Sequence, residues 1–188
     1  MENRDRIIAE ALGLFSQRGY AAVGVQEIAA AAGVTKPTLY HYFGSKRGLL
    51  REILEERFLA LLGRVRPAAA YSGDLPLTLY RLAQAYFSFA RENEEFYRWQ
   101  LAMWFAPPQS ETFLEVTPWN RRQQEMLEEL FLAAARDHGN MKGRHQRYAA
   151  TFLGMVNTLA GLALQGFTRL DDTLVFQVVH QFMHGIYS

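Results

Sequence analysis

The residues best suited to chemistry gather between Gly33 and Leu50, in the stretch GVTKPTLYHYFGSKRGLL. Tyr40, His41 and Tyr42 follow one another there, and a lysine stands on either side of the group. Tyrosine hydroxyls and lysine ammonium groups bond phosphate oxygens, and lysine also donates to the acceptor edge of guanine. A buried strand would account for the aromatic rings but not for the lysines, so this combination favours contact with DNA.

Apolar residues recur at helical spacing almost everywhere, and no convincing alternation with a period of two is present. We therefore expect an all-α fold of about nine helices. Four helices are expected before the clearest break, RVRPAAAYSG at Arg64–Gly73. Five more are expected over residues 75–91, 94–105, 110–138, 144–167 and 171–186, with Pro118 as a candidate break inside the third of them.

The aromatic stretch falls in the third helix, whose ends carry clear local signals. Thr35 can cap its N-terminus, and Pro37 lies in its first turn, where a missing N–H costs nothing. Gly44 ends it after about two turns. Together with the preceding helix and a turn at Gly33, it forms a helix-turn-helix pattern.

One face of this third helix is expected in the core and the rest at the surface. Leu39 and Phe43 are four residues apart and share a face, as core residues do. The remaining faces carry Lys36, Pro37, Tyr40 and His41. These residues fit a helix that enters the major groove, but a small three-helix subdomain with a few surface aromatics remains an alternative.

The segment GYAAVGVQEIAAAAGVTKPTLYHYFGSKRGLL closely resembles the DNA-binding segment of the TetR/AcrR family of bacterial repressors. The match covers about residues 5–55 and includes Ile28-Ala29, Ala32-Gly33-Val34, Leu39-Tyr40, Tyr42-Phe43 and Ser45-Lys46. The resemblance implies that Lys36, Pro37 and Tyr40 face base edges. It also implies that Thr38, His41, Tyr42 and Lys46 hold phosphates.

The start of the second helix departs from the family pattern. Val23 and Gly24 stand where threonine and a second hydroxyl residue are common. Glycine can cap a helix but offers no hydroxyl to a phosphate, so only a backbone contact is expected there. Gln26 is a further candidate for a base or phosphate contact.

Composition limits the class of protein. The 188 residues contain no cysteine, which excludes disulfides and thiolate metal sites and fits a reducing cytoplasm. No apolar run reaches the roughly 18 to 20 residues of a membrane span, and residues 1–12 do not resemble a signal peptide, so we expect a cytoplasmic protein without a membrane partner. Residues 1–66 hold ten Lys/Arg and seven Asp/Glu, and residues 67–188 hold ten and twelve. This slight positive excess near the N-terminus is a weak indication of a polyanionic partner.

We expect two domains: residues 1–46 as the DNA-binding domain and residues 47–188 as a helical domain, connected by the fourth helix. The second domain is rich in aromatic residues, which are either bulky core or the lining of a ligand pocket. The family resemblance implies a pocket here. We expect it to involve Trp99, Met103, Trp104 and Phe131, with a polar contact from Arg98, Gln100 or Asn157.

The last two expected helices, about 144–167 and 171–186, are more apolar than surface helices need to be. Burial within one chain is one explanation. A homodimer is the other, because a two-fold dimer also presents two recognition helices to a palindromic operator. The family resemblance implies a four-helix bundle made from these helices of both subunits.

The sequence gives little support for catalysis or metal binding. The chain lacks cysteine, a Gly-x-Ser-x-Gly elbow and a phosphate-binding glycine loop, so we expect neither an enzyme nor a cofactor. His180 and His184 have a spacing that can chelate zinc. Without a third ligand on the same face we expect no metal site.

These observations predict a ligand-responsive repressor that a small, largely apolar or aromatic inducer releases from a palindromic operator in double-stranded DNA. The fourth helix would connect the two activities through Phe58 and Leu62. Two alternatives remain: a ligand-independent regulator or activator, and a carrier of small molecules or lipids without a DNA function.

Overall fold

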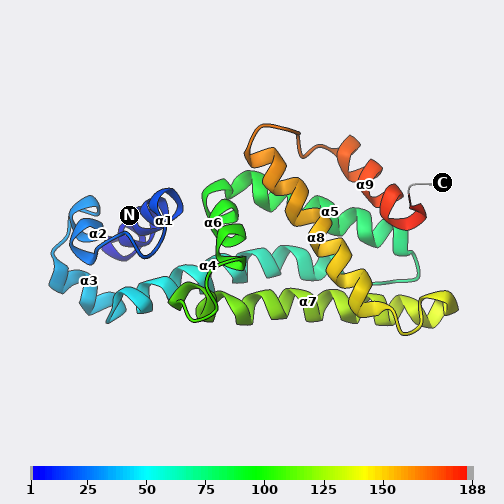
Figure 1. Cartoon of the computed structure of the whole chain (residues 1–188), viewed down its shortest axis with the longest axis horizontal. Helices are drawn as coiled ribbons and strands as arrows, with labels where there is room; N and C mark the ends of the chain where they lie inside the picture. The colour runs from blue at the N-terminus through cyan, green and yellow to red at the C-terminus, as the bar shows by residue number, and fades with distance from the viewer. Residues whose placement is uncertain (1, 186–188) are drawn as a thin grey trace. The chain divides into compact units, whose positions relative to one another are not determined.

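The computed structural model describes residues 2–185, which form nine α-helices and one short 3-10 helix without any strand (Figure 1). This confirms the expected all-α class. Within the described residues, no helix combines the length and the hydropathy required to cross a bilayer.

The chain divides into two compact units. Unit 1 holds residues up to Leu59 together with Glu95–Pro118, and unit 2 holds Ala60–Glu94 and the residues from Trp119 onward. Two long helices, α4 and α7, contribute residues to both units. Unit 1 is therefore built from two separate pieces of the sequence.

The first three helices of unit 1 are α1 (Asn3–Arg18), α2 (Val25–Ala31) and α3 (Lys36–Phe43). They pack against one another around an apolar stripe on α1, as the helical spacing predicts. The stripe consists of Ile7, Ile8, Ala11, Leu12 and Phe15, all buried.

Helix α4 (Lys46–Ala68) continues past the expected break at Arg64. Val65 is completely buried, and its carbonyl accepts a bond from the N–H of Ala69 at 2.9 Å. Pro67 lies in the last turn of α4. A proline interrupts helical hydrogen bonds, but the helix ends one residue later, so the cost here is small. Burial of Val65 thus holds the helix together for one more turn than the sequence pattern indicates.

The junction between α3 and α4 is unusually tight. Gly44 ends α3 with a positive φ of 69°, and its N–H donates to the carbonyl of Tyr40 at 2.8 Å. Ser45 then caps α4 by accepting from the N–H of Gly48 at 2.9 Å. A Cβ atom at Gly48 would lie only 1.9 Å from the carbonyl oxygen of Phe43, so only glycine fits.

The later helices are α5 (Leu75–Glu92), α6 (Glu94–Trp104), α7 (Glu111–Asp137), η1 (Gly139–Met141), α8 (His145–Leu164) and α9 (Asp172–His184). Their positions agree with the expected ones, although the expected end at Ile186 lies outside the described residues.

Pro118 does not split α7. Buried Val116 and Gln123 on its two sides keep the helix continuous despite the missing backbone N–H.

In unit 2, α5 packs against α8 and α9. Tyr86 on α5 is completely buried, and its hydroxyl donates to the side chain of Gln123 on α7 at 3.3 Å. The core of unit 2 is thus aromatic, and the buried Tyr86 hydroxyl in it is hydrogen-bonded.

Replacing Gly48 with alanine should destabilise the protein by about 1–3 kcal/mol or more, because the new methyl group overlaps a backbone oxygen. Gly63→Ala is the matched control, since Gly63 lies on the same helix and a Cβ there meets nothing within 4 Å. That change should stabilise α4 by up to about 1 kcal/mol. Urea unfolding followed by circular dichroism measures both, and equal effects would contradict the close approach.

Candidate nucleic-acid interface

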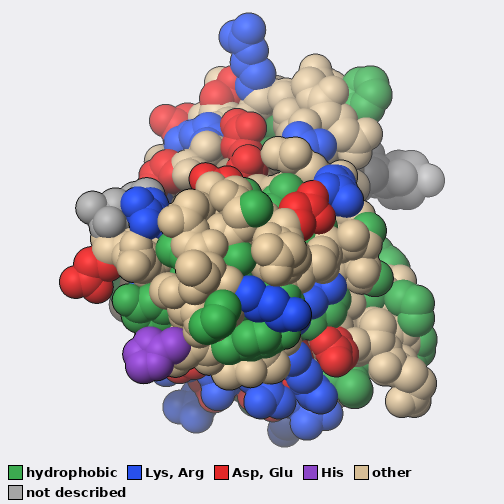
Figure 2. Space-filling view, turned by 90° about the vertical axis from the view of Figure 1, so that its left-hand side faces the viewer, with side chains coloured by type: hydrophobic (Ala, Val, Ile, Leu, Met, Phe, Trp, Pro, Cys, Tyr) green, Lys and Arg blue, Asp and Glu red, His purple; other side chains and the backbone are tan. Residues whose placement is uncertain are grey.

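Helix α3 buries one residue and exposes most of the others. Leu39 is completely buried, whereas Tyr40 is 39% and Tyr42 43% exposed. Lys36, Pro37 and His41 are also exposed, and Thr38 and Phe43 are half-buried. Figure 2 looks onto the side where α2 and α3 lie in Figure 1, and hydrophobic side chains adjoin Lys and Arg side chains there.

The exposed face of α3 combines a cation with aromatic rings. The ammonium nitrogen of Lys36 lies 5.6 Å from the centroid of the Tyr40 ring, one helical turn away. The ring of His41 meets that of Tyr42 edge-on, at 5.6 Å between centroids. Thr35 caps the helix by accepting from the N–H of Thr38 at 3.3 Å, as predicted. This face offers ammonium, imidazole and phenol groups to a partner.

Lys46 is held more closely by the protein than the sequence indicates. Its ammonium group donates to the backbone carbonyl of Tyr20 at 2.6 Å and lies 4.1 Å from the centroid of the Tyr20 ring. Burial lowers the pKa of Lys46 below its usual value. A lysine has three N–H donors, so Lys46 can bind Tyr20 and still donate to a second acceptor.

The structure at the N-terminal end of α2 accounts for one departure from the family pattern. Val23 is 1% exposed, so its side chain belongs to the core rather than to the surface. Gly24 is the N-cap of α2 and supplies no side-chain bond to it. Gln26, one residue into the helix, is exposed. A phosphate here would meet backbone N–H groups and not a hydroxyl.

Two glutamates at the start of α7 also belong to unit 1. Glu115 accepts bonds from Nε of Arg47 at 2.6 Å and from Nε of Arg51 at 2.8 Å. Glu111 accepts a bond from the hydroxyl of Tyr20. The guanidinium groups of Arg51 and Arg47 hold the pKa of Glu115 below its usual range. No local motif marks these pairs, because their members are more than 60 positions apart in the sequence.

Three of the four residues predicted to contact a ligand lie on α6 in unit 1. Trp99 and Met103 are 3% and 2% exposed, and Trp104 is half-buried. The Trp99 ring lies 5.5 Å from that of Phe15. Gln100 is 4% exposed, and its Oε1 atom has no hydrogen-bond partner within the described part of the chain. A buried acceptor without a partner requires an explanation, such as a donor supplied by water or by a ligand.

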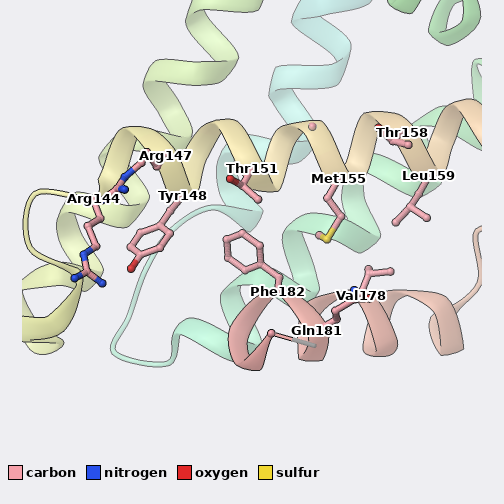
Figure 3. Close-up of a pocket in the computed structure, with 12 residues that line it drawn as sticks. Arg144, Arg147, Tyr148, Thr151, Met155, Thr158, Leu159, Val178, Gln181 and Phe182 are labelled. Carbon is pink, nitrogen blue, oxygen red and sulfur yellow. The ribbon is translucent and has the colours of Figure 1, made fainter. Parts of the chain in front are cut away.

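The fourth predicted residue, Phe131, is 1% exposed and lines a cavity of about 270 Å³ in unit 2. A larger groove of about 810 Å³ runs between α8 and α9. Figure 3 shows Tyr148 and Met155 projecting from α8 toward α9, from which Phe182 points back. Arg144 lies at one end of this groove.

The two histidines considered for zinc lie close together on α9. The ring centroids of His180 and His184 are 4.5 Å apart, and the ring of His180 stacks on Phe176. Over residues 2–185, no three acidic or histidine side chains converge as metal ligands would.

A family model described as bacterial regulatory proteins, tetR family, matches residues 7–53. The transcriptional activator FasR of Mycolicibacterium smegmatis is 36% identical over 97 residues, which are 52% of this chain and 44% of FasR. The chain thus spans less than half the length of this curated relative.

Solved structures resemble the chain over nearly all of its length. The TetR-family regulator PfmR of Thermus thermophilus has a TM-score of 0.77 and 27% identity, covering 99% of this chain and 98% of PfmR. FadR of Bacillus subtilis, solved in complex with stearoyl-CoA, has a TM-score of 0.80 over 97% and 98% of the two chains. At 18% identity, the likeness to FadR is one of fold.

Replacing Glu115 with glutamine should lower the melting temperature at pH 7, because a neutral amide accepts weaker bonds from Arg47 and Arg51. The folded pKa of Glu115 is lowered, so its contribution to stability is present above the ordinary glutamate pKa of about 4.3 and is lost as the pH falls through the folded pKa. The difference between the variant and the unaltered protein should therefore shrink below about pH 4.

Thermal unfolding at several pH values measures this difference. Glu125→Gln is the control, because Glu125 lies exposed on the same helix. A difference between Glu115→Gln and the unaltered protein that stays constant into acid would contradict the ionic role of Glu115.

Proposed function

Because this chain belongs to the TetR/AcrR family of bacterial transcriptional regulators, which bind DNA and are not enzymes, we propose that it is a ligand-responsive repressor. In this proposal, a small, largely apolar or aromatic inducer releases it from a palindromic operator in the bacterial cytoplasm. The observation that carries the proposal is the exposed face of α3, where Lys36 pairs with the Tyr40 ring.

Residues 1–46 would read the DNA. Lys36, Pro37 and Tyr40 would face base edges in the major groove, where lysine donates to guanine and aromatic rings pack on thymine methyl groups. Phosphates would be held by Thr38, His41, Tyr42 and the remaining donors of Lys46. Most of this set is exposed in the free protein, namely Lys36, Pro37, Tyr40, His41 and Tyr42.

Residues 47–188 would bind the ligand and form the homodimer, with α4 as the connector. The groove between α8 and α9 would receive the same helices of a second copy. Leu162 on α8 and Phe176 on α9 are 37% and 65% exposed, and a partner would remove this apolar surface from water. A two-fold dimer would also place two α3 helices on one face of a palindrome.

The inducer would contact Trp99, Met103 and Trp104 on α6, with Gln100 as the polar contact. Phe131 lines a cavity of unit 2 and is left out of this site. The unpaired Oε1 atom of Gln100 supports this role, because a ligand N–H or O–H would satisfy it. Release requires that the inducer bind the DNA-free state more tightly, by the roughly 1 to 3 kcal/mol usual for allosteric coupling.

Two other functions would use the chain differently. An activator would bind the same operator but raise transcription, as the name of FasR states for that protein. A carrier without a DNA function would not require the exposed cation and aromatic rings of α3. Operator selection separates the carrier from both regulators, and a reporter gene separates the regulators from each other.

The test is selection of operator fragments from random duplex DNA by the purified protein at a fixed, stated salt concentration. Enrichment of a palindrome is the expected result. Enrichment of a site without two-fold symmetry would contradict the dimer, and no enrichment in ligand-free protein would contradict the DNA function.

Lys36→Ala should weaken binding to the selected operator by about 1–3 kcal/mol and relax the preference at one base pair of each half-site. Lys142→Ala is the matched control, because Lys142 is exposed in the turn after η1 and its loss changes the net charge equally. Fluorescence anisotropy with the operator and single-base variants measures both. Equal losses for the two variants would show that Lys36 contributes only its charge.

Gln100→Met should keep or raise the stability of the protein and weaken its response to the ligand. Removing a buried acceptor without a partner should leave the protein as stable or stabilise it, by up to about 1–3 kcal/mol. The compound that releases the operator in a ligand screen should then be required at about three- to tenfold higher concentration, since one hydrogen bond is lost. Gln109→Met, at an exposed position, is the control. An unchanged response would remove Gln100 from the ligand site.

A further inference from the structure

The cavity beside Phe131 lies where the ends of several unit 2 helices meet. Residues from the start of α5, the end of α7, η1, α8 and α9 line it, and it is partly open to solvent, because His138 and Asn140 are exposed; we call it the end cavity. Its volume is about 270 Å³. A buried apolar cavity of about 150 Å³ is enough to hold benzene, so the end cavity has room for a substituted ring or a small bicyclic compound.

Aromatic rings form much of the wall of the end cavity. Phe131 lies 5.6 Å from Tyr148 and 6.0 Å from Phe182, measured between ring centroids. The ring of Phe182 also contacts that of Phe152 edge-on, at 5.4 Å between centroids, and this contact restricts the orientation of the Phe182 ring. The ring pairs are tilted and not parallel, an arrangement that accepts the edge or face of a further ring. This wall selects for an aromatic ligand.

The polar groups of the lining set the charge of such a ligand. His138, Asn140 and the Tyr148 hydroxyl offer hydrogen bonds, and none of them makes a side-chain hydrogen bond to another residue between 2 and 185. Of the described residues that line the cavity, none is Lys, Arg, Asp or Glu, and His138 is the one histidine among them. At an alkaline pH, where an imidazole is neutral, a charged ligand would therefore lose hydration without gaining an opposite charge. The lining favours a neutral molecule that carries a hydrogen-bonding group.

Two side chains belong to both the end cavity and the groove between α8 and α9. Tyr148 and Phe182 line each of them, and Figure 3 shows both side chains on the groove side. A ligand that fixes these rings in the cavity also fixes them in the groove. The groove itself differs in character, because Arg144 and Arg147 line it.

We infer that the end cavity is a binding site for a small, neutral aromatic molecule with one hydrogen-bonding group, which packs on Phe131, Tyr148 and Phe182. Its effect on DNA rests on the proposed function: by fixing Tyr148 and Phe182, the ligand would alter the surface on which the second subunit packs. Occupancy of the cavity itself does not depend on that function.

The experiment compares two probes of equal shape, neutral 2-naphthamide and anionic 2-naphthoate, by isothermal titration calorimetry on the full chain without DNA, at about pH 8.5, where an imidazole is neutral. Saturable binding of 2-naphthamide, with 2-naphthoate at least about tenfold weaker, is the expected result. Absence of saturable 2-naphthamide binding, or equal affinity for the two probes, would overturn the inference.

A pair of neighbouring variants locates the site. Met141→Trp should fill the cavity from η1 and weaken 2-naphthamide at least about tenfold. Lys142→Trp adds the same ring at the next position, which is exposed and outside the lining, and should bind like the unaltered protein. Equal binding by both variants would place the probe elsewhere and overturn the inference. Circular dichroism confirms that each variant is folded.

The effect of the probe on DNA binding is measured separately, as the affinity of the protein for the selected operator with and without 2-naphthamide. Binding of the probe that leaves the operator affinity unchanged would refute the link through Tyr148 and Phe182 while supporting the site. Failure to select any operator would count against the proposed function and would leave the calorimetric result standing.

Discussion

The close approach of Gly48 to the carbonyl oxygen of Phe43 is the constraint on which the proposed DNA-binding face of α3 depends. It lets the first turn of α4 begin directly against the last turn of α3, with only Gly44 and Ser45 between them. Backbone contact at this junction, together with the buried Leu39 side chain, therefore fixes the orientation of α3. A helix held in this way can present the same side chains at each encounter, which reduces the entropy lost when it docks.

Around this junction, unit 1 pairs some of its charged side chains with acceptors and leaves another exposed. Glu115 engages Arg47 and Arg51, and the carbonyl of Tyr20 engages Lys46. Within residues 2–185, the Lys36 ammonium group contacts the ring of Tyr40 and not a carboxylate, so its charge is less compensated than those of Arg47 and Arg51. The protein thus uses some of its cations to assemble the unit and leaves another at the surface.

Local signals made the third helix predictable from the sequence, and long-range packing accounts for what was missed. The cap at Thr35 and the stop at Gly44 act within a few residues, so both are confirmed. The break expected over residues 64–73 begins only after Ala68, and the split considered at Pro118 is absent, because burial of Val65 and Val116 outweighs the effect of a nearby proline. The unpaired state of Gln100 and the partners of Glu115 depend on which helices become neighbours, and no spacing within the sequence encodes that.

The discontinuous make-up of unit 1 has a consequence for engineering. A graft of one contiguous N-terminal piece cut after residue 46 would separate Tyr20 from its acceptor Glu111. A piece cut after residue 59 would also carry Arg47 and Arg51 without their acceptor Glu115. A functional chimera would have to carry the start of α7 as well, or match those two glutamates in the recipient.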